Sequence, residues 1–255
     1  MSATLRMETE KLKALVTPTQ NRFEMWPQIV EAISATSVAE IGVFRGNFAR
    51  AILERCTDIA TYYFVDPWRH LDDGYNELAN VSDDIFTQYK EEALSVTAFA
   101  GDTRVVLQGM TQEVIDQVPD ESLDFVYIDA DHTLRGITVD LIKWFPKVKP
   151  GGYIGGDDFG PTIFQQPLAY EPSPIFPWAV HFAEAMDISL YALPHWQFLL
   201  HKNTTGSFSF TDLTDGDYAD VSLRSQVVRG PSWYFKKQYL VPLYHRLFPS
   251  KRPKV

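Results

Sequence analysis

The chain is 255 residues long, with 45% hydrophobic, 14% aromatic and 22% charged residues. This length allows one large domain with a substantial core, and the balance of apolar and charged residues excludes wholesale disorder. The formal charge of −10 at pH 7 argues against a nucleic-acid-binding function. Because Cys56 is the single cysteine, a disulfide framework is excluded, a cysteine-based zinc site is disfavoured, and a cytoplasmic location is the default expectation.

The two ends of the sequence differ from its centre. No apolar run reaches the roughly 18 residues of a membrane span, and the first 16 residues fit an amphipathic helix better than a secretory signal. We therefore expect a helical N-terminal segment over 1–36. Eight basic residues follow the last acidic residue, Asp220, so we expect a domain over 1–220 and a basic, aromatic extension over 221–255. The extension would dock on the acidic body or on a partner subunit of a homo-oligomer. The alternative is a patch for an anionic substrate or a membrane surface.

Apolar segments of strand length alternate with segments of helical period, which is typical of an α/β protein with a mainly parallel sheet. We expect strands at 37–43, 62–66, 96–100, 123–129 and 152–156, and a closing antiparallel pair at 188–192 and 197–202. Between them we expect helices at 22–34, at 47–56 capped by Asn47, up to Lys90, at 103–117 capped by Thr103, and at 134–145.

Two long segments, 69–84 and 160–177, follow expected strand ends and show no regular pattern. Ligands of open α/β sheets bind at such ends, and long loops in a compact domain are usually functional. The second segment contains five prolines, with Phe164, Tyr170 and Phe176 between them. We expect it to form a lid over the substrate. A fixed crossover between two strands is the alternative.

A glycine-containing turn follows the first expected strand and contains Glu40, Gly42, Phe44 and Gly46. Glycine lets a backbone approach a ligand closely at the positive end of a helix. The Gly-x-x-x-Gly spacing differs from the dinucleotide fingerprint, which disfavours a nicotinamide-dependent oxidoreductase. A carboxylate at Glu40 suits a cationic or hydroxyl-bearing ligand, and a plain tight turn is the alternative.

Two further acidic positions follow expected strands. Asp66 ends the second strand, where a carboxylate can accept hydrogen bonds from ribose hydroxyls. Asp102 and Thr103 follow the expected third strand, in a place to reach an adenine edge. Turn and helix-cap roles are the alternatives for these residues.

The strongest signal is acidic. Asp129, Asp131 and His132 follow one buried strand, and Asp157 and Asp158 follow the next. If the strands are neighbours, carboxylates gather at one sheet edge and raise one another's pKa. A divalent cation would resolve the repulsion, and an all-oxygen set favours a hard ion such as Mg²⁺. Capping of the following helices is the alternative.

In this order the motifs resemble those of class I S-adenosylmethionine-dependent methyltransferases. They resemble more closely the metal-dependent O-methyltransferases that include macrocin and related sugar O-methyltransferases. The resemblance spans about residues 38–159 and implies a Rossmann-like, mainly parallel, seven-stranded sheet with helices on both faces. It is carried by 40–46 (EIGVFRG), Asp66, 101–103 (GDT), 128–132 (IDADH), 140–144 (DLIKW), 149–152 (KPGG) and 156–159 (GDDF).

The resemblance also implies residue roles. The methionine part of the cofactor would be held by Glu40, Gly42, Phe44 and Gly46. The ribose would be held by Asp66, with Asp102 and Thr103 beside the adenine. The metal ligands would be Asp129, Asp157 and Asp158, and the base would be Asp131 or His132.

The expected reaction is transfer of a methyl group from S-adenosylmethionine to a hydroxyl of a small molecule with vicinal hydroxyls. A sugar or glycoside is favoured because several aromatic residues offer ring faces, and a catechol is the alternative. These aromatic residues are Trp178, Trp196, Trp233 and Tyr234. Two alternatives of other classes are a nicotinamide-dependent oxidoreductase and a non-catalytic cofactor-binding module.

Overall fold

A twisted eight-stranded sheet organises the part of the chain that the computed structural model describes, residues 9–71, 75, 79–164, 172–203, 206–218, 240 and 246–247. The strand order is β3-β2-β1-β4-β5-β7-β6-β8. The strands are β1 (Ser37–Ile41), β2 (Thr61–Asp66), β3 (Arg104–Gln108), β4 (Leu123–Ile128), β5 (Val148–Gly156), β6 (Ser189–Leu193), β7 (Gln197–His201) and β8 (Ser209–Asp212).

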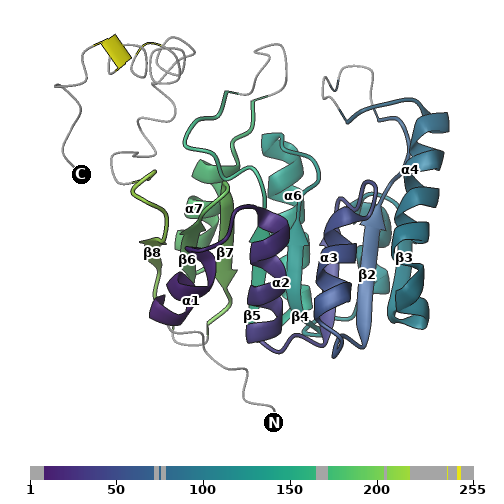
Figure 1. Ribbon diagram of the computed structural model, residues 1–255, viewed down its shortest axis with the longest axis horizontal. Coiled ribbons are helices and arrows are strands. Elements are labelled where there is room, and N and C mark those ends of the chain that lie inside the picture. Colours follow the sequence, from purple (N-terminus) through teal and green to yellow (C-terminus); the bar gives the residue numbers. More distant parts are fainter. Residues whose placement is uncertain are drawn as a thin grey trace.

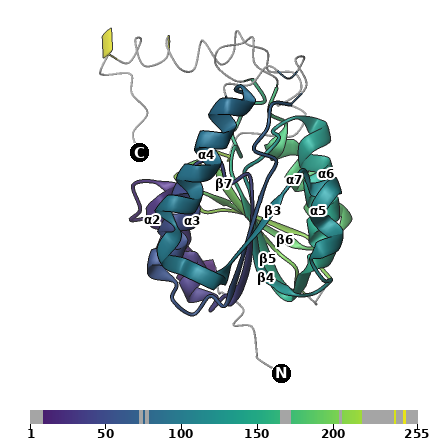
Figure 2. The same cartoon turned by 90° about the vertical axis from the view of Figure 1, so that its right-hand side faces the viewer.

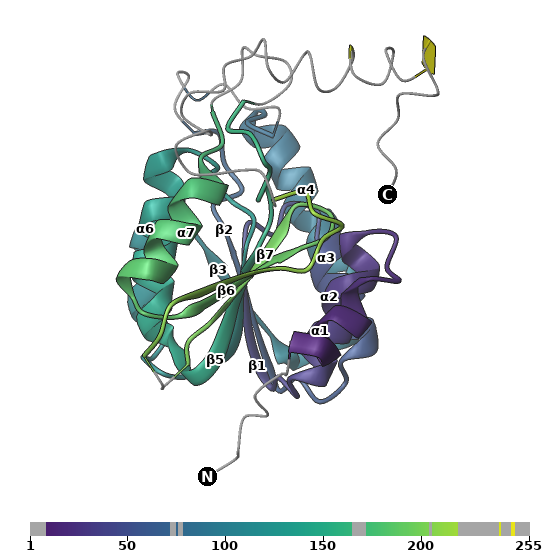
Figure 3. The ribbon, with the colours of Figure 1, turned by 90° about the vertical axis from the view of Figure 1, so that its left-hand side faces the viewer.

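Helices cover both faces of this sheet (Figure 1). Seen along the sheet, α1 to α4 lie on one side and α5 to α7 on the other (Figures 2 and 3). The helices are α1 (Thr9–Val16), α2 (Arg22–Ala32), α3 (Asn47–Arg55), α4 (Asp83–Val96), α5 (Thr111–Val114), α6 (Leu134–Trp144) and α7 (Ile175–Ala185). Short 3₁₀ turns lie at Ala98–Thr103, Ile115–Gln117 and Phe145–Lys147.

Each face of the sheet has its own hydrophobic core. Trp26 of α2 packs with Phe125 and Tyr127 of β4 on one face, while Leu141 and Trp144 of α6 lie in the core of the other face. Central strands buried on both faces are nearly continuous apolar runs. This explains why β1, β2 and β4 are readable in the sequence.

The parallel register brings the carboxyl ends of five strands to one edge. Ile41 of β1 pairs with Val65 of β2 and with Ile128 of β4, which in turn pairs with Gly156 of β5. Asp66 of β2 pairs with Gln108 of β3. The loops that follow these strands therefore meet at the same edge, as the sequence predicts.

Three details of the predicted architecture are wrong. The described sheet has eight strands instead of seven, because β8 adds to β6 in parallel beyond the antiparallel β5–β7 and β6–β7 pairs. The segment 96–100 is the end of α4 and a 3₁₀ turn, so the third strand begins only at Arg104, inside the helix expected at 103–117; Thr103 therefore caps no helix there, and only Thr111–Val114 is α-helical. Helix α3 is not capped by the Asn47 side chain, because its N-cap is Gly46, whose φ is +78°.

The predicted lid is only partly described, since residues 165–171 lie outside the described chain. Within its described part, α7 already begins at Ile175. The Phe176 side chain is 3% exposed and contacts the Phe159 ring in the core, so Phe176 is not a closing surface. Most of the predicted C-terminal extension also lies outside the described residues.

In the described part of the chain, each helix is too short or too polar to span a membrane.

Candidate active site

A pocket of about 790 Å³ opens at the carboxyl edge of the sheet. Its lining comes from the turns that follow β1, β2, β3 and β4 and from the start of α6. This volume is in the usual range for a small-molecule site. Most of the residues singled out in the sequence line this pocket or lie beside it.

The glycine turn after β1 packs against other parts of the protein. Gly42 has a φ of +91°, and a Cβ at this residue would lie 1.9 Å from the carbonyl oxygen of Asp129. Gly46 has a φ of +78°, and a Cβ there would lie 2.7 Å from Cα of Ala93 in α4. The glycines thus allow the turn to fit tightly between α4 and the β4 loop, which places Glu40 and Phe44 at the pocket.

Replacing Gly42 by alanine is expected to lower the free energy of unfolding by about 3 kcal/mol or more. The added methyl group meets backbone, and alanine disfavours a positive φ. Gly101→Ala is the matched control, because Gly101 has a φ of +52° but nothing within 4 Å of an added Cβ. Its cost should be smaller, about 1–3 kcal/mol, because only the conformational part remains. Equal losses in urea unfolding of the two variants would contradict the close approach at Gly42.

Glu40 is a carboxyl at the floor of the pocket, with 1% of its surface exposed. The Tyr62 hydroxyl donates a hydrogen bond to it over 2.6 Å. Burial raises the pKa of Glu40 well above its ordinary value, although the hydrogen bond from Tyr62 opposes this shift. A cationic ligand group in the pocket would stabilise the ionised form of this carboxyl.

Asp66 joins the turns that follow β1 and β2. Its two carboxylate oxygens accept hydrogen bonds from the backbone N–H groups of Phe44 (2.8 Å) and Trp68 (2.7 Å). The Trp68 indole donates to the Phe44 carbonyl over 2.8 Å, which holds Phe44 at a φ of +52°. Burial raises the pKa of Asp66 to about 6, against these backbone hydrogen bonds. Asp66 therefore has the turn role that the sequence left open, and it also lines the pocket.

The structure does not bring Asp102 and Thr103 to the pocket. Both residues precede β3, so they lie at the edge of the sheet opposite the carboxyl ends of the parallel strands. They were expected at the pocket because a strand was expected at 96–100, before them. The turn that follows β3 instead contributes Gly109, Met110 and Thr111 to the lining. These residues were missed in the sequence. The available signal was Gly109, because a glycine that directly follows a short segment such as Arg104–Gln108 is typical of the turn after a strand.

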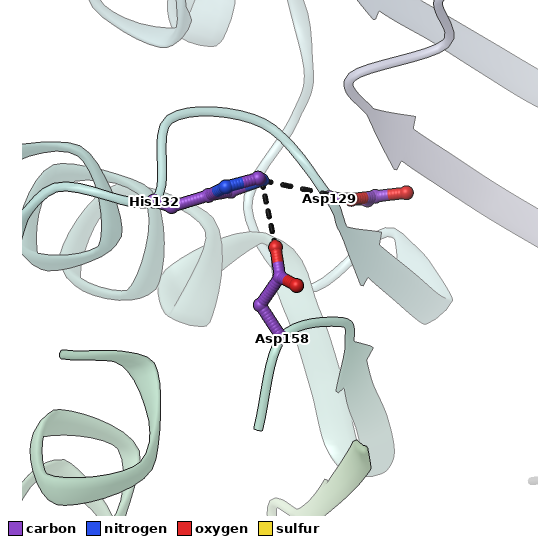
Figure 4. A group of neighbouring side chains, drawn as sticks. All are labelled: Asp129, His132 and Asp158. Carbon is purple, nitrogen blue, oxygen red and sulfur yellow. Dashed lines mark ion pairs between the residues drawn. The ribbon is translucent and has the colours of Figure 1, made fainter. Parts of the chain in front are cut away.

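Asp129, His132 and Asp158 form a cluster at the ends of β4 and β5 (Figure 4). The His132 Nε2 atom lies 2.9 Å from Asp158 Oδ2 and 3.9 Å from Asp129 Oδ1. Burial raises the pKa of Asp129, partly offset by Arg22. For Asp158 burial acts in the same direction, but the hydrogen bond and charge of His132 lower the pKa below its ordinary value. One potential ligand atom from each residue lies within 4.8 Å of the others.

Arg22 lies beside this cluster and was missed in the sequence. Its guanidinium donates to Asp129 Oδ2 over 2.7 Å and also pairs with Asp157. Burial opposes its charge, but Asp129 and Tyr127 raise the pKa of Arg22 above its ordinary value. Trp26, one turn later in α2, packs where a Cβ on Gly155 would lie. This glycine of β5 therefore lets the start of α2 approach the acidic residues.

Both carboxylate oxygens of Asp157 have protein partners. One pairs with Arg22, and the other accepts from the Gln197 amide and from the Asp158 backbone N–H over 2.8 Å. Gln197 is fully buried and accepts hydrogen bonds from the Trp26 indole (2.7 Å) and the Tyr127 hydroxyl (2.8 Å). Among the described residues, Asp157 is thus beside the cluster of potential ligands without being part of it.

Asp131 faces the pocket from the turn before α6. One of its oxygens accepts the Thr133 backbone N–H over 2.9 Å, while the Thr133 side chain caps α6 by accepting from Gly136. Gly136 leaves room for Asp131, since a Cβ there would lie 2.2 Å from its carboxyl carbon. The two predicted bases therefore differ in what their side chains face: Asp131 faces the pocket, whereas His132 Nε2 faces Asp158.

A buried polar network at another wall of the pocket was also missed. The Thr111 hydroxyl donates to Asp140 over 2.6 Å and accepts from the Trp144 indole over 3.0 Å. Asp140 is 5% exposed. Burial raises the pKa of Asp140 to about 7, and the nearby Asp131 acts in the same direction.

The comparison with protein families decides the class of this domain. Residues 39–159, a little under half of the chain, match the family model described as a methyltransferase domain. Residues 39–159 are therefore similar to a methyltransferase domain. The matched segment starts in β1 and ends directly after Asp158, so this domain includes Glu40, Asp66 and the acidic cluster. The predicted enzyme class is confirmed.

Solved structures confirm the fold of the methyltransferase domain. A protein from Corynebacterium glutamicum is 16% identical and superposes with a TM-score of 0.52, covering 77% of this chain and 92% of its own. A protein from Staphylococcus aureus, provisionally named a caffeoyl-CoA O-methyltransferase, is 15% identical with a TM-score of 0.51 and coverages of 70% and 81%. A provisionally named O-methyltransferase from Klebsiella pneumoniae is 15% identical with a TM-score of 0.50 and coverages of 79% and 84%. No curated protein matches the chain.

Proposed function

We propose that this protein is an S-adenosylmethionine-dependent O-methyltransferase that uses a divalent cation and acts on a small molecule with vicinal hydroxyls. One observation carries the proposal. One pocket of the methyltransferase domain is lined by two buried carboxyl groups, Glu40 and Asp66, together with Asp129 and His132 of the cluster that Asp158 completes. The provisional names of the two similar proteins from Staphylococcus aureus and Klebsiella pneumoniae agree with an oxygen acceptor.

The residues at the β1 and β2 ends fit the proposed cofactor. Glu40 is a buried carboxyl that an ammonium group would stabilise, which suits the methionine part. The Asp66 oxygens accept hydrogen bonds from the backbone N–H groups of Phe44 and Trp68. A carboxylate has about four acceptor positions, so Asp66 can also accept a hydrogen bond from a ribose hydroxyl. We propose that the turn after β3, with Gly109 and Met110, lies beside the adenine in place of Asp102 and Thr103. The cofactor supplies a methyl group on a sulfonium.

The acidic cluster fits a cation and an acceptor hydroxyl. Asp129 and Asp158 offer carboxylate oxygens next to the proposed methionine site, at the ends of adjacent strands. The chemistry that a bound cation supplies is a lower pKa for the acceptor hydroxyl. The sequence favoured Mg²⁺ because it placed three aspartates around the ion, with Asp157 as the third.

Asp131 is the better placed of the two proposed bases. Its carboxyl group lines the pocket, and only one of its oxygens is engaged by the Thr133 backbone in the described structure. In His132, by contrast, Nε2 faces Asp158 and Nδ1 is buried. We propose that Asp131 holds the proton that leaves the acceptor hydroxyl and that Asp129 positions the acceptor.

The proposed acceptor is a sugar or glycoside, with a catechol as the alternative. Trp196 supports a sugar, since its side chain is 49% exposed and lies 3.9 Å from a Cβ built on Gly160, two residues after Asp158. Trp178 instead packs partly buried against the core. Trp233 and Tyr234 lie outside the described residues. Product analysis with labelled cofactor and a panel of methyl glycosides and catechols would separate the two classes.

Calorimetry with S-adenosylhomocysteine tests the cofactor site. Asp66→Ala is expected to weaken binding about 10- to 100-fold, corresponding to lost hydrogen bonds to a charged group. Asp102→Ala is the matched control, because Asp102 is an exposed aspartate away from the pocket, and it should bind like the wild type. Circular dichroism would establish that both variants fold. Wild-type affinity in Asp66→Ala, or no binding by the wild type, would contradict the proposal.

A further inference from the structure

We propose that Asp129, His132 and Asp158 form a mixed nitrogen and oxygen metal site that selects a first-row transition-metal ion over Mg²⁺. The inference deepens the proposed function and relies on it for the role of the cation. The ligand set itself rests on the geometry of the described side chains.

The first observation is the convergence of the three side chains. His132 Nε2 points between Asp158 Oδ2 at 2.9 Å and Asp129 Oδ1 at 3.9 Å (Figure 4). Donor atoms that share a metal at bond lengths of about 2.0–2.2 Å lie roughly 3–4 Å apart. The three side chains therefore need only small rotations to bind one ion.

The second observation is the engagement of Asp157. Binding an ion through Asp157 would mean displacing Arg22 from one oxygen, or the Gln197 amide and the Asp158 backbone N–H from the other. Gln197 is itself fixed by the buried Trp26 indole. Asp157 is thus a positioning residue that holds the turn of Asp158.

Arg22 also orients Asp129. It binds Oδ2 of Asp129 at 2.7 Å, so that Oδ1 is the oxygen nearest His132. Partners that orient ligands in this way are a common feature of metal sites. The arrangement leaves one imidazole nitrogen and two carboxylates as the ligands offered by the described chain.

This donor set determines which ion is preferred. Mg²⁺ prefers oxygen ligands in an octahedral arrangement and loses its water reluctantly. An imidazole ligand favours ions later in the first transition series, such as Co²⁺ and Zn²⁺. Exchanging Asp157 for His132 in the ligand set therefore changes the expected preference from Mg²⁺ to a transition-metal ion.

Direct metal binding tests this inference without an acceptor. In calorimetry on metal-free protein, Co²⁺ and Zn²⁺ should bind at least about 100-fold more tightly than Mg²⁺. His132→Gln should lose more than about 100-fold in Co²⁺ affinity, since even outer partners of ligands contribute about 10- to 100-fold. Its Mg²⁺ affinity should change by less than about threefold. Asp131→Asn, in the same turn, is the control and should keep wild-type Co²⁺ affinity.

The wild-type Co²⁺ protein gives a second measurement that needs no substitution. Its proton NMR spectrum should contain one strongly shifted, exchangeable imidazole N–H signal, and this signal should be absent in His132→Gln. Equal affinities for Mg²⁺ and Co²⁺, undiminished Co²⁺ binding in folded His132→Gln, or no metal binding at all would overturn the inference. Calorimetry with S-adenosylhomocysteine on the same samples separates this result from the proposed function. If the cofactor product binds but Mg²⁺ binds as tightly as Co²⁺, or His132→Gln keeps its Co²⁺ affinity, only the ligand assignment fails. If the cofactor product does not bind, or no metal binds at all, the proposed function is contradicted as well.

Discussion

Removal of divalent cations is expected to abolish methyl transfer to the acceptor. Without the ion, the acceptor hydroxyl keeps its ordinary high pKa and loses its proton less readily. Without the cation, Asp129 and Asp158 would also have no positive ion between them and the acceptor hydroxyl to hold the acceptor in place. We expect turnover in excess EDTA to fall by about 10³-fold or more, and addition of a divalent cation to restore it. Transfer of labelled methyl groups measures this effect.

The binding of S-adenosylhomocysteine is the internal control, because Glu40 and Asp66 do not belong to the cluster of potential ligands. Its affinity should change less than about threefold on chelation. Asp158→Asn should reproduce the loss of turnover with the cation present, while Asp102→Ala should retain full activity. Unchanged turnover in EDTA, with no metal detected by elemental analysis, would leave Asp131 and His132 as a metal-free acid–base pair.

The edge of the sheet that carries the site could be predicted because buried parallel strands are readable in sequence. Polar residues mark the carboxyl ends of the apolar runs of β1, β2, β4 and β5. Because these strands are parallel neighbours, their carboxyl ends meet at one edge of the sheet. Glu40, Asp66, Asp129 and Asp158 were thereby placed correctly at one edge without knowledge of any contact.

The third strand was misplaced because of how its residues are buried. β3 is at the edge of the sheet, so of its residues Arg104–Gln108 only Leu107 is buried, and the segment forms a weak apolar signal. The segment 96–100 is more apolar, but Val96 ends α4 and a 3₁₀ turn follows. This error alone moved the expected adenine contact to Asp102 and Thr103.

The partners of the acidic residues could not be predicted from local patterns. Arg22 lies 107 positions before Asp129, and Gln197 lies 40 positions after Asp157. What brings Arg22 to the site is the packing of Trp26 against Gly155, a tertiary contact. The repulsion expected among the aspartates pointed to a cation, whereas the folded chain places Arg22 and His132 beside them.

The second large expected effect concerns Asp140 and stability. Burial raises the pKa of this carboxyl to about 7, whereas an unfolded aspartate titrates near 3.9. The folded state therefore holds the proton more tightly. The stabilising contribution of Asp140 is complete below pH about 4 and is lost as the pH rises through 7. Asp140→Asn does not titrate and can still accept the Thr111 hydroxyl. The free energy of unfolding of Asp140→Asn minus that of the wild type should therefore increase by about 2–3 kcal/mol between pH 5 and pH 8.5.

Urea unfolding at pH 5, 7 and 8.5 measures this difference, and Asp124→Asn is the matched control. Asp124 is half-buried, yet the Lys149 ammonium and the Thr36 backbone lower its pKa below the ordinary value despite the effect of burial. Its contribution to stability is therefore present above pH about 4 and disappears only on further acidification. The difference between Asp124→Asn and the wild type should stay constant from pH 5 to pH 8.5. A difference for Asp140→Asn that is equally constant would mean that Asp140 is already ionised in the folded protein at pH 5, with its charge compensated inside the pocket wall.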